Sequence, residues 1–472
     1  MLFNSLNFML FLVMVVFIYY SITVNRWRKI FLLLASYYFY ACWNVVFVGI
    51  LFFVTMISYV FGLYLYRRKS KLVLTAGIIT LLLPLVTFKY LNFLLSSAND
   101  VFKAFSFDIS IRLVNLMLPV GISFFTFMAI GYVVDVFKQK VEVERNLMDY
   151  ALFLGFFPQI TSGPIGRAGQ LIPQFKEKQI LIYENFAIGA RMMLWGFFMK
   201  LVVGDRAGIY VDTVFGAFEH HSGISLMLAS VLYSIQIYCD FAGYSFIAIG
   251  CARIMGYQLM VNFMRPYFAI SVGDFWRRWH ISLSTWFRDY VYIPLGGNRC
   301  SKFRQFLNLM ITFLVSGLWH GAAWNFVLWG GLHSVCQIVV KLTSKGREKI
   351  WKDCTSLWIK RLRTIGNMTF TFVTVTYLWM IFRIPSFSQA IEITKGYLQE
   401  GSLYLHPTTI FFLGVGFVIL LIKDLKDEYL PEKHFFLESK YAVVRYGSFA
   451  TLLAIIIFIG ILGDGQFIYF QF

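Results

Sequence analysis

The chain has 472 residues, of which 59% are apolar, 19% are aromatic and only 14% are charged. A soluble globular protein carries about 25% charged residues, so this composition excludes that class. The net charge of +18 could suit nucleic acid, but positively charged cytoplasmic loops of a membrane protein explain it more simply. We therefore expect an all-α, polytopic integral membrane protein that contacts membrane lipid and binds no nucleic acid.

Apolar segments that are long enough to cross a hydrocarbon core of about 30 Å recur along the whole chain, and we expect about eleven transmembrane helices. The candidate segments for these spans are roughly 5–22, a pair within 30–66, 72–95, 115–137, 183–203, 222–252, 304–320, 323–342, 364–383, 408–423 and 442–461. The pair is expected to turn near Ala41 to Asn44. The first segment lacks the basic start and the cleavage site of a signal peptide, so we interpret it as a span. Because no repeat or flexible linker is visible, we expect one domain over 1–472.

Basic clusters lie at the ends of these segments, at 26–29, 67–71 and 138–145. An even number of spans between them would keep all three on the cytoplasmic side, with the N-terminus outside. The cysteines are Cys42, Cys239, Cys251, Cys300, Cys336 and Cys354. They show no metal-ligand spacing and lie mostly in apolar runs, so we expect neither a metal nor a disulfide framework.

The stretch Phe156–Arg167 does not fit an ordinary span. Its two prolines and two glycines would interrupt a helix, although it directly follows apolar sequence. Non-helical backbone at membrane depth is tolerated only where it is buried in protein or lines a water-filled cavity. Two interpretations remain open here, a re-entrant loop near a functional site and a plain interfacial loop.

The stretch Asn262–Arg299 is too charged to cross a membrane. Ser271, followed by Asp274 three residues later, resembles a capping box and predicts that a helix begins there. At about 100° per residue, one face of this helix is aromatic and the other is charged. The aromatic face contains Trp276, Trp279, His280, Leu283, Trp286, Phe287 and Tyr290, and the charged face contains Arg277, Arg278, Thr285, Arg288 and Asp289. Such an amphipathic helix lies in a membrane interface or packs inside a protein cavity.

His320 lies within an apolar run that begins near Phe306 and continues past Trp329. An ionisable side chain at membrane depth is costly and therefore rare without a function. The small residues around it would let a ligand or a second helix come close; they are Gly317, Gly321, Ala322 and Ala323. A structural histidine bonded to a neighbouring helix is one interpretation. The second histidine, His280, favours a functional one, in which a desolvated neutral imidazole removes the proton of a hydroxyl.

Several motifs in this chain are specific. They are Asp274–Tyr290 with its continuation Tyr292–Arg299, Gly317–Ala322 with Trp324 and Asn325, Ser162–Ile165, Tyr238–Ser245 and Phe467–Phe472. Together they resemble the membrane-bound O-acyltransferase (MBOAT) family, and in particular its bacterial alginate O-acetyltransferase branch. The resemblance covers nearly the whole chain, and its two histidine blocks are the most specific part.

The resemblance implies an MBOAT fold around a central tunnel, with His320 as the catalytic base and His280 as a second functional residue. It implies no bound cofactor, but acetyl-CoA or another acyl thioester as a cytoplasmic donor substrate. The acyl group would leave toward the outer side of a bacterial cytoplasmic (inner) membrane, where an SGNH-type acyltransferase partner often completes transfer to a polysaccharide. One departure is Phe246, where many relatives carry an acidic residue.

Other side chains are weaker candidates for lining the donor site or the tunnel. They are Trp319, Asn325, Asp240, Arg277, Arg288, Trp279 and Trp286. Asp240 needs a partner in apolar sequence, such as an arginine of 277–288, and either lines the tunnel or closes a salt bridge. Arg277 and Arg288 could bind donor phosphates or form a solvated face. His333 is more readily explained as a structural histidine.

Three other functions stay open at this point. D-alanyl transfer to a teichoic acid would use a carrier-protein thioester, although Pro294–Asn298 favours the alginate-type branch. A transporter of a lipid or sugar often carries internal repeats, and none is visible. A structural scaffold leaves the two histidines in apolar surroundings unexplained. Labelled acetyl-CoA separates an acyltransferase from a transporter, because only the former transfers the label.

Overall fold

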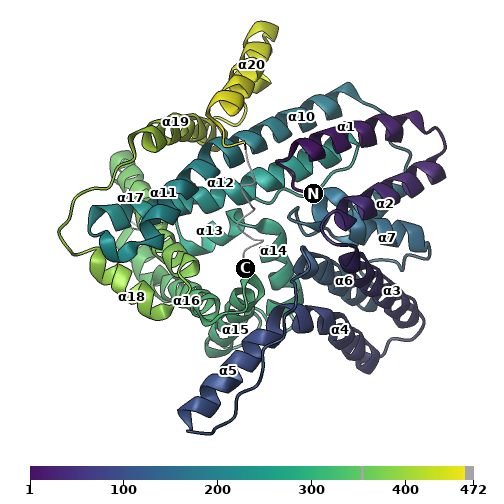
Figure 1. The fold of residues 1–472 in the computed structure, drawn as a ribbon, viewed down its shortest axis with the longest axis horizontal. Helices are drawn as coiled ribbons and strands as arrows, with labels where there is room; N and C mark the ends of the chain where they lie inside the picture. Colours follow the sequence, from purple (N-terminus) through teal and green to yellow (C-terminus); the bar gives the residue numbers. More distant parts are fainter. Residues whose placement is uncertain (352–355, 463–472) are drawn as a thin grey trace. The chain divides into compact units, whose positions relative to one another are not determined.

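The computed structural model describes residues 1–351 and 356–462, and the regular elements within these ranges are helices (Figure 1). Eight runs of helix in the described ranges are long and apolar enough to cross a membrane. They are Val45–Arg67, Lys71–Ala104, Tyr183–Gly216, Ile224–Ile254, Trp324–Ser344, Leu357–Arg383, Pro407–Tyr429 and Ala442–Ile459. Two shorter apolar helices, Leu6–Ser21 and Ile122–Phe137, coincide with two further predicted spans. The predicted all-α, multi-pass membrane architecture is confirmed. The predicted motif Phe467–Phe472 and Cys354 lie outside the described residues.

The chain forms two compact units. The first contains residues 1–193 and 248–260. Its helices are α1 (Leu6–Ser21), α2 (Asn25–Ala41), α3 (Val45–Arg67), α4 (Lys71–Leu85), α5 (Leu91–Ala104), α6 (Ile122–Phe137), α7 (Leu147–Gly155), α8 (Phe157–Ile160) and α9 (Ala168–Lys176), with most of α10 (Tyr183–Phe197). The predicted turn between α2 and α3 is confirmed, since Asn44 caps α3 by accepting a hydrogen bond from the Val46 amide at 2.9 Å.

The irregular stretch predicted at Phe156–Arg167 belongs to this first unit. It contains the single turn α8 and then non-helical backbone, and residues 156–165 are all buried. The packing is tight, because a Cβ on Gly121 would lie 2.1 Å from the carbonyl oxygen of Ile160. Buried irregular backbone favours the re-entrant interpretation over a plain interfacial loop. The proximity of this stretch to a functional site stays a prediction.

The second unit contains residues 194–247 and the described residues after 260. Its elements include η2 (Phe198–Gly204), α11 (Asp205–Gly216), part of α12 (Ile224–Ile254), α13 (Val272–Arg278), α14 (Ile281–Phe287), η5 (Arg288–Tyr292), α15 (Lys302–His320), α16 (Trp324–Trp351), α17 (Leu357–Arg383), α18 (Phe387–Gly396), α19 (Pro407–Tyr429), η6 (Phe436–Glu438) and α20 (Ala442–Ile459). Both histidine blocks lie in this unit.

Helices α15 and α16 pack against each other through glycine (Figure 1). A Cβ on Gly317 would lie 2.2 Å from the carbonyl oxygen of Phe326, and one on Gly330 would lie 2.2 Å from that of Phe313. Only glycine lets two helix backbones approach so closely, as in other membrane helix pairs. The small residues beside His320 therefore admit a second helix, one of the two uses predicted for them.

Candidate active site

The helix that begins after Ser271 is interrupted at His280. The predicted helix start is confirmed, because the Ser271 side chain accepts a hydrogen bond from the Asp274 amide at 3.1 Å. The predicted continuous helix through Tyr290 is wrong, however. α13 ends at Arg278, His280 adopts a left-handed conformation with φ of +43°, and α14 begins at Ile281. A non-glycine residue in this region is uncommon and costs about 1–3 kcal/mol, so the surroundings must hold it there.

Asn262 holds the break in place. Its carbonyl oxygen accepts from the Ile281 amide at 2.9 Å, which takes that amide out of the helical pattern. Its side-chain Oδ1 accepts from the Ser282 amide at 3.1 Å and from the Ser282 hydroxyl at 2.9 Å, and it contacts Nδ1 of His280 at 3.1 Å. Its Nδ2 donates to the hydroxyl of Ser245 at 3.2 Å. An asparagine eighteen positions before the histidine thus orients the imidazole.

These contacts determine which ring nitrogen of His280 carries the proton. A backbone amide can only donate, so the Asn262 atom facing Ser282 must be the acceptor Oδ1. Nδ1 of His280, which shares that acceptor, therefore carries the proton, and Nε2 holds the lone pair in the neutral ring. His280 is fully buried and lies outside the candidate spans, and burial lowers its pKa from 6.5 to about 3. The imidazole is neutral and presents Nε2 as a base or hydrogen-bond acceptor.

Aromatic rings enclose His280 on several sides. The ring of Phe241 stands edge-on at 4.6 Å between centroids, and that of Phe263 is stacked at 6.4 Å. The indole of Trp319 lies 5.8 Å away. The predicted placement of His280 among aromatic side chains is confirmed, although a break in the helix produces it.

His320 is the last residue of α15 and is also buried. Its ring lies against three aromatic rings, with centroid distances of 4.9 Å to Trp319, 5.1 Å to Trp329 and 5.5 Å to Phe382. The chain leaves the helix at Gly321, where a Cβ would lie 2.1 Å from the Phe326 ring. His320 is therefore placed by the packing of α15 on α16 and α17.

Trp319 packs against both histidines. Its indole lies 5.8 Å from the imidazole of His280 and 4.9 Å from that of His320, measured between ring centroids. The structure thus brings together two predicted site residues from separate motifs, both packed against one tryptophan predicted to line the site. We call His280, Trp319 and His320 the histidine cluster.

His333 lies one helical turn after Trp329 in the same aromatic region. Its ring centroid is 4.7 Å from that of Trp329, and its Nδ1 accepts a hydrogen bond from Nε1 of Trp276 at 3.2 Å. The proton of the neutral ring is therefore on Nε2, the opposite of His280. The ring is fully buried, and its hydrogen bond from Trp276 fits the structural role predicted for this histidine.

Asp240 pairs with Lys200, and an arginine of the 277–288 segment is not its partner. Lys200 is buried in η2 and also binds Asp205 at 2.7 Å. The expected arginine partner was wrong because Arg278 is held by Glu428 at 2.9 Å and by Asp274 at 3.2 Å. Lys200 carried a sequence signal that the prediction missed, since it is a cation within an apolar run.

The charged face of the segment does not enter the histidine cluster. The side chain of Arg277 is 75% exposed and pairs with Asp274 at 3.3 Å. That of Arg288 is 60% exposed and pairs with Asp289 at 2.8 Å. Their predicted binding of donor phosphates stays a prediction, and it would have to occur at the surface of this unit.

The remaining candidates are buried and support the cluster. Trp279 packs against Trp379 and Phe263, with ring centroids 4.9 Å and 5.0 Å away. Trp286 packs on Tyr290, with ring centroids 5.0 Å apart. Asn325 donates to the carbonyl oxygens of Phe382 and Ile384 at 3.3 Å and 3.1 Å, at the end of α17. It fixes the position of Phe382, one wall of the His320 pocket.

Comparison with known proteins agrees with these motifs. A profile of the membrane-bound O-acyltransferase family matches residues 32–380. A protein of Azotobacter vinelandii named probable alginate O-acetylase AlgI is 36% identical over 83% of this chain and 76% of its own length. A peptidoglycan O-acetyltransferase of Helicobacter pylori is 32% identical over 94% of this chain and 91% of its own length. A teichoic acid D-alanyltransferase of Bacillus subtilis is more distant, at 29% identity over 55% of this chain and 67% of its own length.

Proposed function

The chain belongs to the membrane-bound O-acyltransferase family, and from that premise we propose that it transfers an acetyl group to hydroxyls of an exported polysaccharide. It is an O-acyltransferase of the multi-pass membrane type. The donor would be acetyl-CoA or another acyl thioester that reaches the enzyme from the cytoplasm. The membrane would be the bacterial cytoplasmic membrane, and the acyl group would leave on its outer side.

The histidine cluster is the observation that carries this proposal. Two buried imidazoles pack against Trp319, and burial, which lowers the pKa of His280, keeps that ring neutral. A neutral imidazole in a water-poor site can accept the proton of a hydroxyl, which is what acyl transfer to an alcohol needs. The names of the acetyl-transferring relatives, at 36% and 32% identity, support acetyl as the group that is moved.

In the proposed reaction, His320 removes the proton of the acceptor hydroxyl while the hydroxyl oxygen attacks the thioester carbonyl. A C–O bond forms, the C–S bond breaks, and the thiolate leaves with the proton that His320 took up. General-base catalysis of this kind contributes about 10²–10⁴-fold to the rate. Trp319, Trp329 and Phe382 surround the imidazole and keep water away from it.

His280 would orient a substrate group. Two roles are open to it, orienting the donor or steadying the developing oxyanion. An oxyanion needs a hydrogen-bond donor, whereas Nε2 of His280 carries a lone pair in the tautomer set by Asn262. The tautomer therefore favours the first role, in which Nε2 accepts a hydrogen bond from an N–H or O–H group of the substrate.

The decisive experiment offers radiolabelled acetyl-CoA and a polysaccharide fragment to the purified protein in lipid nanodiscs. We expect label on the glycan with the wild type and a loss of at least about 100-fold in the His320→Ala variant. His434→Ala is the matched control, because His434 is an exposed histidine of the same unit and should retain activity. Wild-type transfer by His320→Ala would contradict the assignment of the base.

D-alanyl transfer from a carrier-protein thioester is the alternative, and the similarity to the Bacillus subtilis enzyme is the observation in its favour. The same assay separates the two when D-alanyl carrier protein and acetyl-CoA are offered in parallel. An SGNH-type acyltransferase partner on the outer side is part of the proposal, and adding its catalytic domain should increase acetylation of the polysaccharide.

A further inference from the structure

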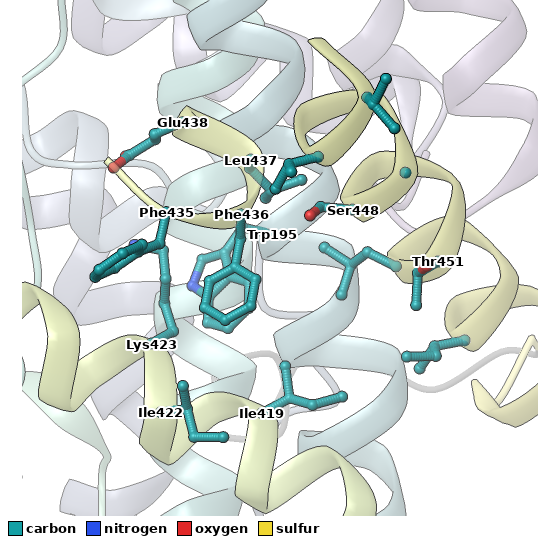
Figure 2. A pocket seen from close by; sticks show the side chains of 15 residues that line it. Trp195, Ile419, Ile422, Lys423, Phe435, Phe436, Leu437, Glu438, Ser448 and Thr451 are labelled. Carbon is teal, nitrogen blue, oxygen red and sulfur yellow. The ribbon is translucent and has the colours of Figure 1, made fainter. Parts of the chain in front are cut away.

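A groove between α19 and α20 lies outside the histidine cluster and has no role in the proposed reaction. It has a volume of about 510 Å³, which falls within the about 300–1,000 Å³ of typical ligand pockets. Figure 2 shows Ile419 and Ile422 of α19 on one side, and Ser448 and Thr451 of α20 on the other. The rings of Trp195 and Phe436 lie between them.

Both walls of the groove are apolar enough to cross a membrane. α19 and α20 are two of the candidate spans, and α20 is the least covered of them, with 11% of its apolar window buried among the described residues. The groove therefore opens toward the hydrocarbon region of the bilayer. The molecules that surround it at that depth are acyl chains, since water is absent there.

The connection between the two helices, residues 430–441, marks one end of the groove as the membrane interface. Its exposed side chains include Phe435, Phe436 and Tyr441 together with Lys433 and Lys440. Aromatic and basic side chains gather in this way at the level of lipid headgroups. A lipid with its headgroup at this connection would direct its chain along the groove.

Phe436 adopts an uncommon backbone conformation to line the groove. Its φ is +53°, in the left-handed region that a bulky side chain rarely adopts. Such residues persist only where the surroundings determine them, and they cluster where a ligand is held. Leu437, the next residue, is buried and anchors the turn.

The polar groups at the rim neutralise one another. Lys423 pairs with Asp427, and Glu438 pairs with Lys426 at 2.7 Å. These four side chains therefore contribute no net charge to the groove. The selective part of the groove is its apolar wall.

We infer that this groove binds one acyl chain of a bilayer phospholipid, selected by the chain and not by the charge of the headgroup. This inference does not rest on the proposed function. It identifies a lipid site apart from any substrate site of the acyltransferase reaction.

The test places the full-length protein in nanodiscs of phosphatidylethanolamine and phosphatidylglycerol that contain a phospholipid with a photoreactive diazirine on its chain. After illumination, mass spectrometry maps the adducts. We expect them to concentrate on residues of α19 and α20 that line the groove, to the same extent with a zwitterionic and an anionic probe. Thr451→Phe and Gly447→Phe should each reduce these adducts to the level of the exposed faces.

Both variants place the ring in the groove without crowding the protein, since both positions are exposed and a Cβ on Gly447 meets nothing within 4 Å. Ala450→Phe is the matched control, because Ala450 is exposed on α20 and does not line the groove; it should retain the adducts. Uniform labelling of every exposed helix face overturns the inference. A strong preference for the anionic probe would also overturn it. A protein–protein crosslink through the groove would overturn it as well, by identifying a protein as the occupant.

Discussion

The histidine cluster and the α19–α20 groove are both apolar regions of the second unit, yet they are built in opposite ways. The cluster is filled by its own rings, and each imidazole is placed by close packing or by a hydrogen bond at 3.1 Å. The groove leaves about 510 Å³ open, and its polar groups pair with one another at the rim. Catalysis needs a few polar atoms at fixed positions, whereas holding a lipid chain needs space.

The largest effect should come from disrupting the close backbone contact between α15 and α16, which positions His320. In Gly330→Ala the added Cβ would meet the Phe313 carbonyl oxygen at 2.2 Å, so α15 must move away from α16 and displace His320. We expect a destabilisation of about 1–3 kcal/mol or more and nearly complete loss of transfer activity. Thermal melts and acetyl-transfer rates in detergent measure the two effects.

Gly331→Ala is the matched control for this change. Its Cβ would lie 3.4 Å from a leucine side-chain carbon, which is an ordinary contact, so this variant should keep its stability and its activity. If both variants behave alike, the backbone contact does not position the histidine, and the contrast with the open groove loses its basis.

The next effect tests whether the cluster depends on directed hydrogen bonds. Asn262→Ala removes the acceptor shared by His280 and Ser282. An unsatisfied buried group destabilises the fold by about 1–3 kcal/mol. The imidazole also loses its orientation, so we expect a loss of about tenfold to a hundredfold in kcat/KM. Ser245→Ala removes only the bond at Nδ2 and should cost less. Equal losses in the two variants would show that the tautomer of His280 is irrelevant to the rate.

A smaller effect is the response of stability to pH. Burial lowers the pKa of His280 from 6.5 to about 3, so between these values the unfolded chain binds a proton that the folded protein does not. The unfolding free energy is therefore unaffected by this histidine above pH 6.5, and it decreases as the pH falls from 6.5 toward 3. We expect the unfolding free energy of the wild type to decrease more steeply with falling pH than that of His280→Gln, by up to about 1.4 kcal/mol per pH unit. Parallel slopes would contradict the buried, neutral state of this ring.

The smallest effect should come from the groove. Thr451→Phe changes an exposed position that is no part of the histidine cluster, so acetyl transfer should stay within about twofold of the wild type. Ala450→Phe, measured beside it, controls for the added ring. A large loss of activity in Thr451→Phe alone would show that the two regions are coupled.

The fold followed from the sequence wherever local patterns decide it. The length of the apolar segments predicted the spans. The stretch ending at Asn44 predicted a turn, Ser271 predicted a helix start, and the small residues beside His320 predicted a close approach of a ligand or a second helix. These signals act within a few residues. The structure has helices at all of these places, although α2 and α15 are not among the candidate membrane spans of the described residues.

The site was less predictable because its decisive contacts join distant residues. The helical period placed His280 on an aromatic face, but the break at that residue depends on Asn262, which no period reveals. The partner of Asp240 is Lys200, forty positions earlier, and not one of the arginines of the 277–288 segment. Phe382 comes to His320 from α17, and only the folded chain shows it.

The glycine contact between α15 and α16 also suggests a route to redesign. Because Gly317 and Gly330 hold His320 through the backbones of the two helices, the rings around the imidazole contribute shape more than anchorage. Trp329 and Phe382 could then be exchanged for smaller side chains while the base keeps its position. A set of such variants would admit acyl groups of graded length, and the main-chain contact would serve as the fixed frame on which selectivity is varied.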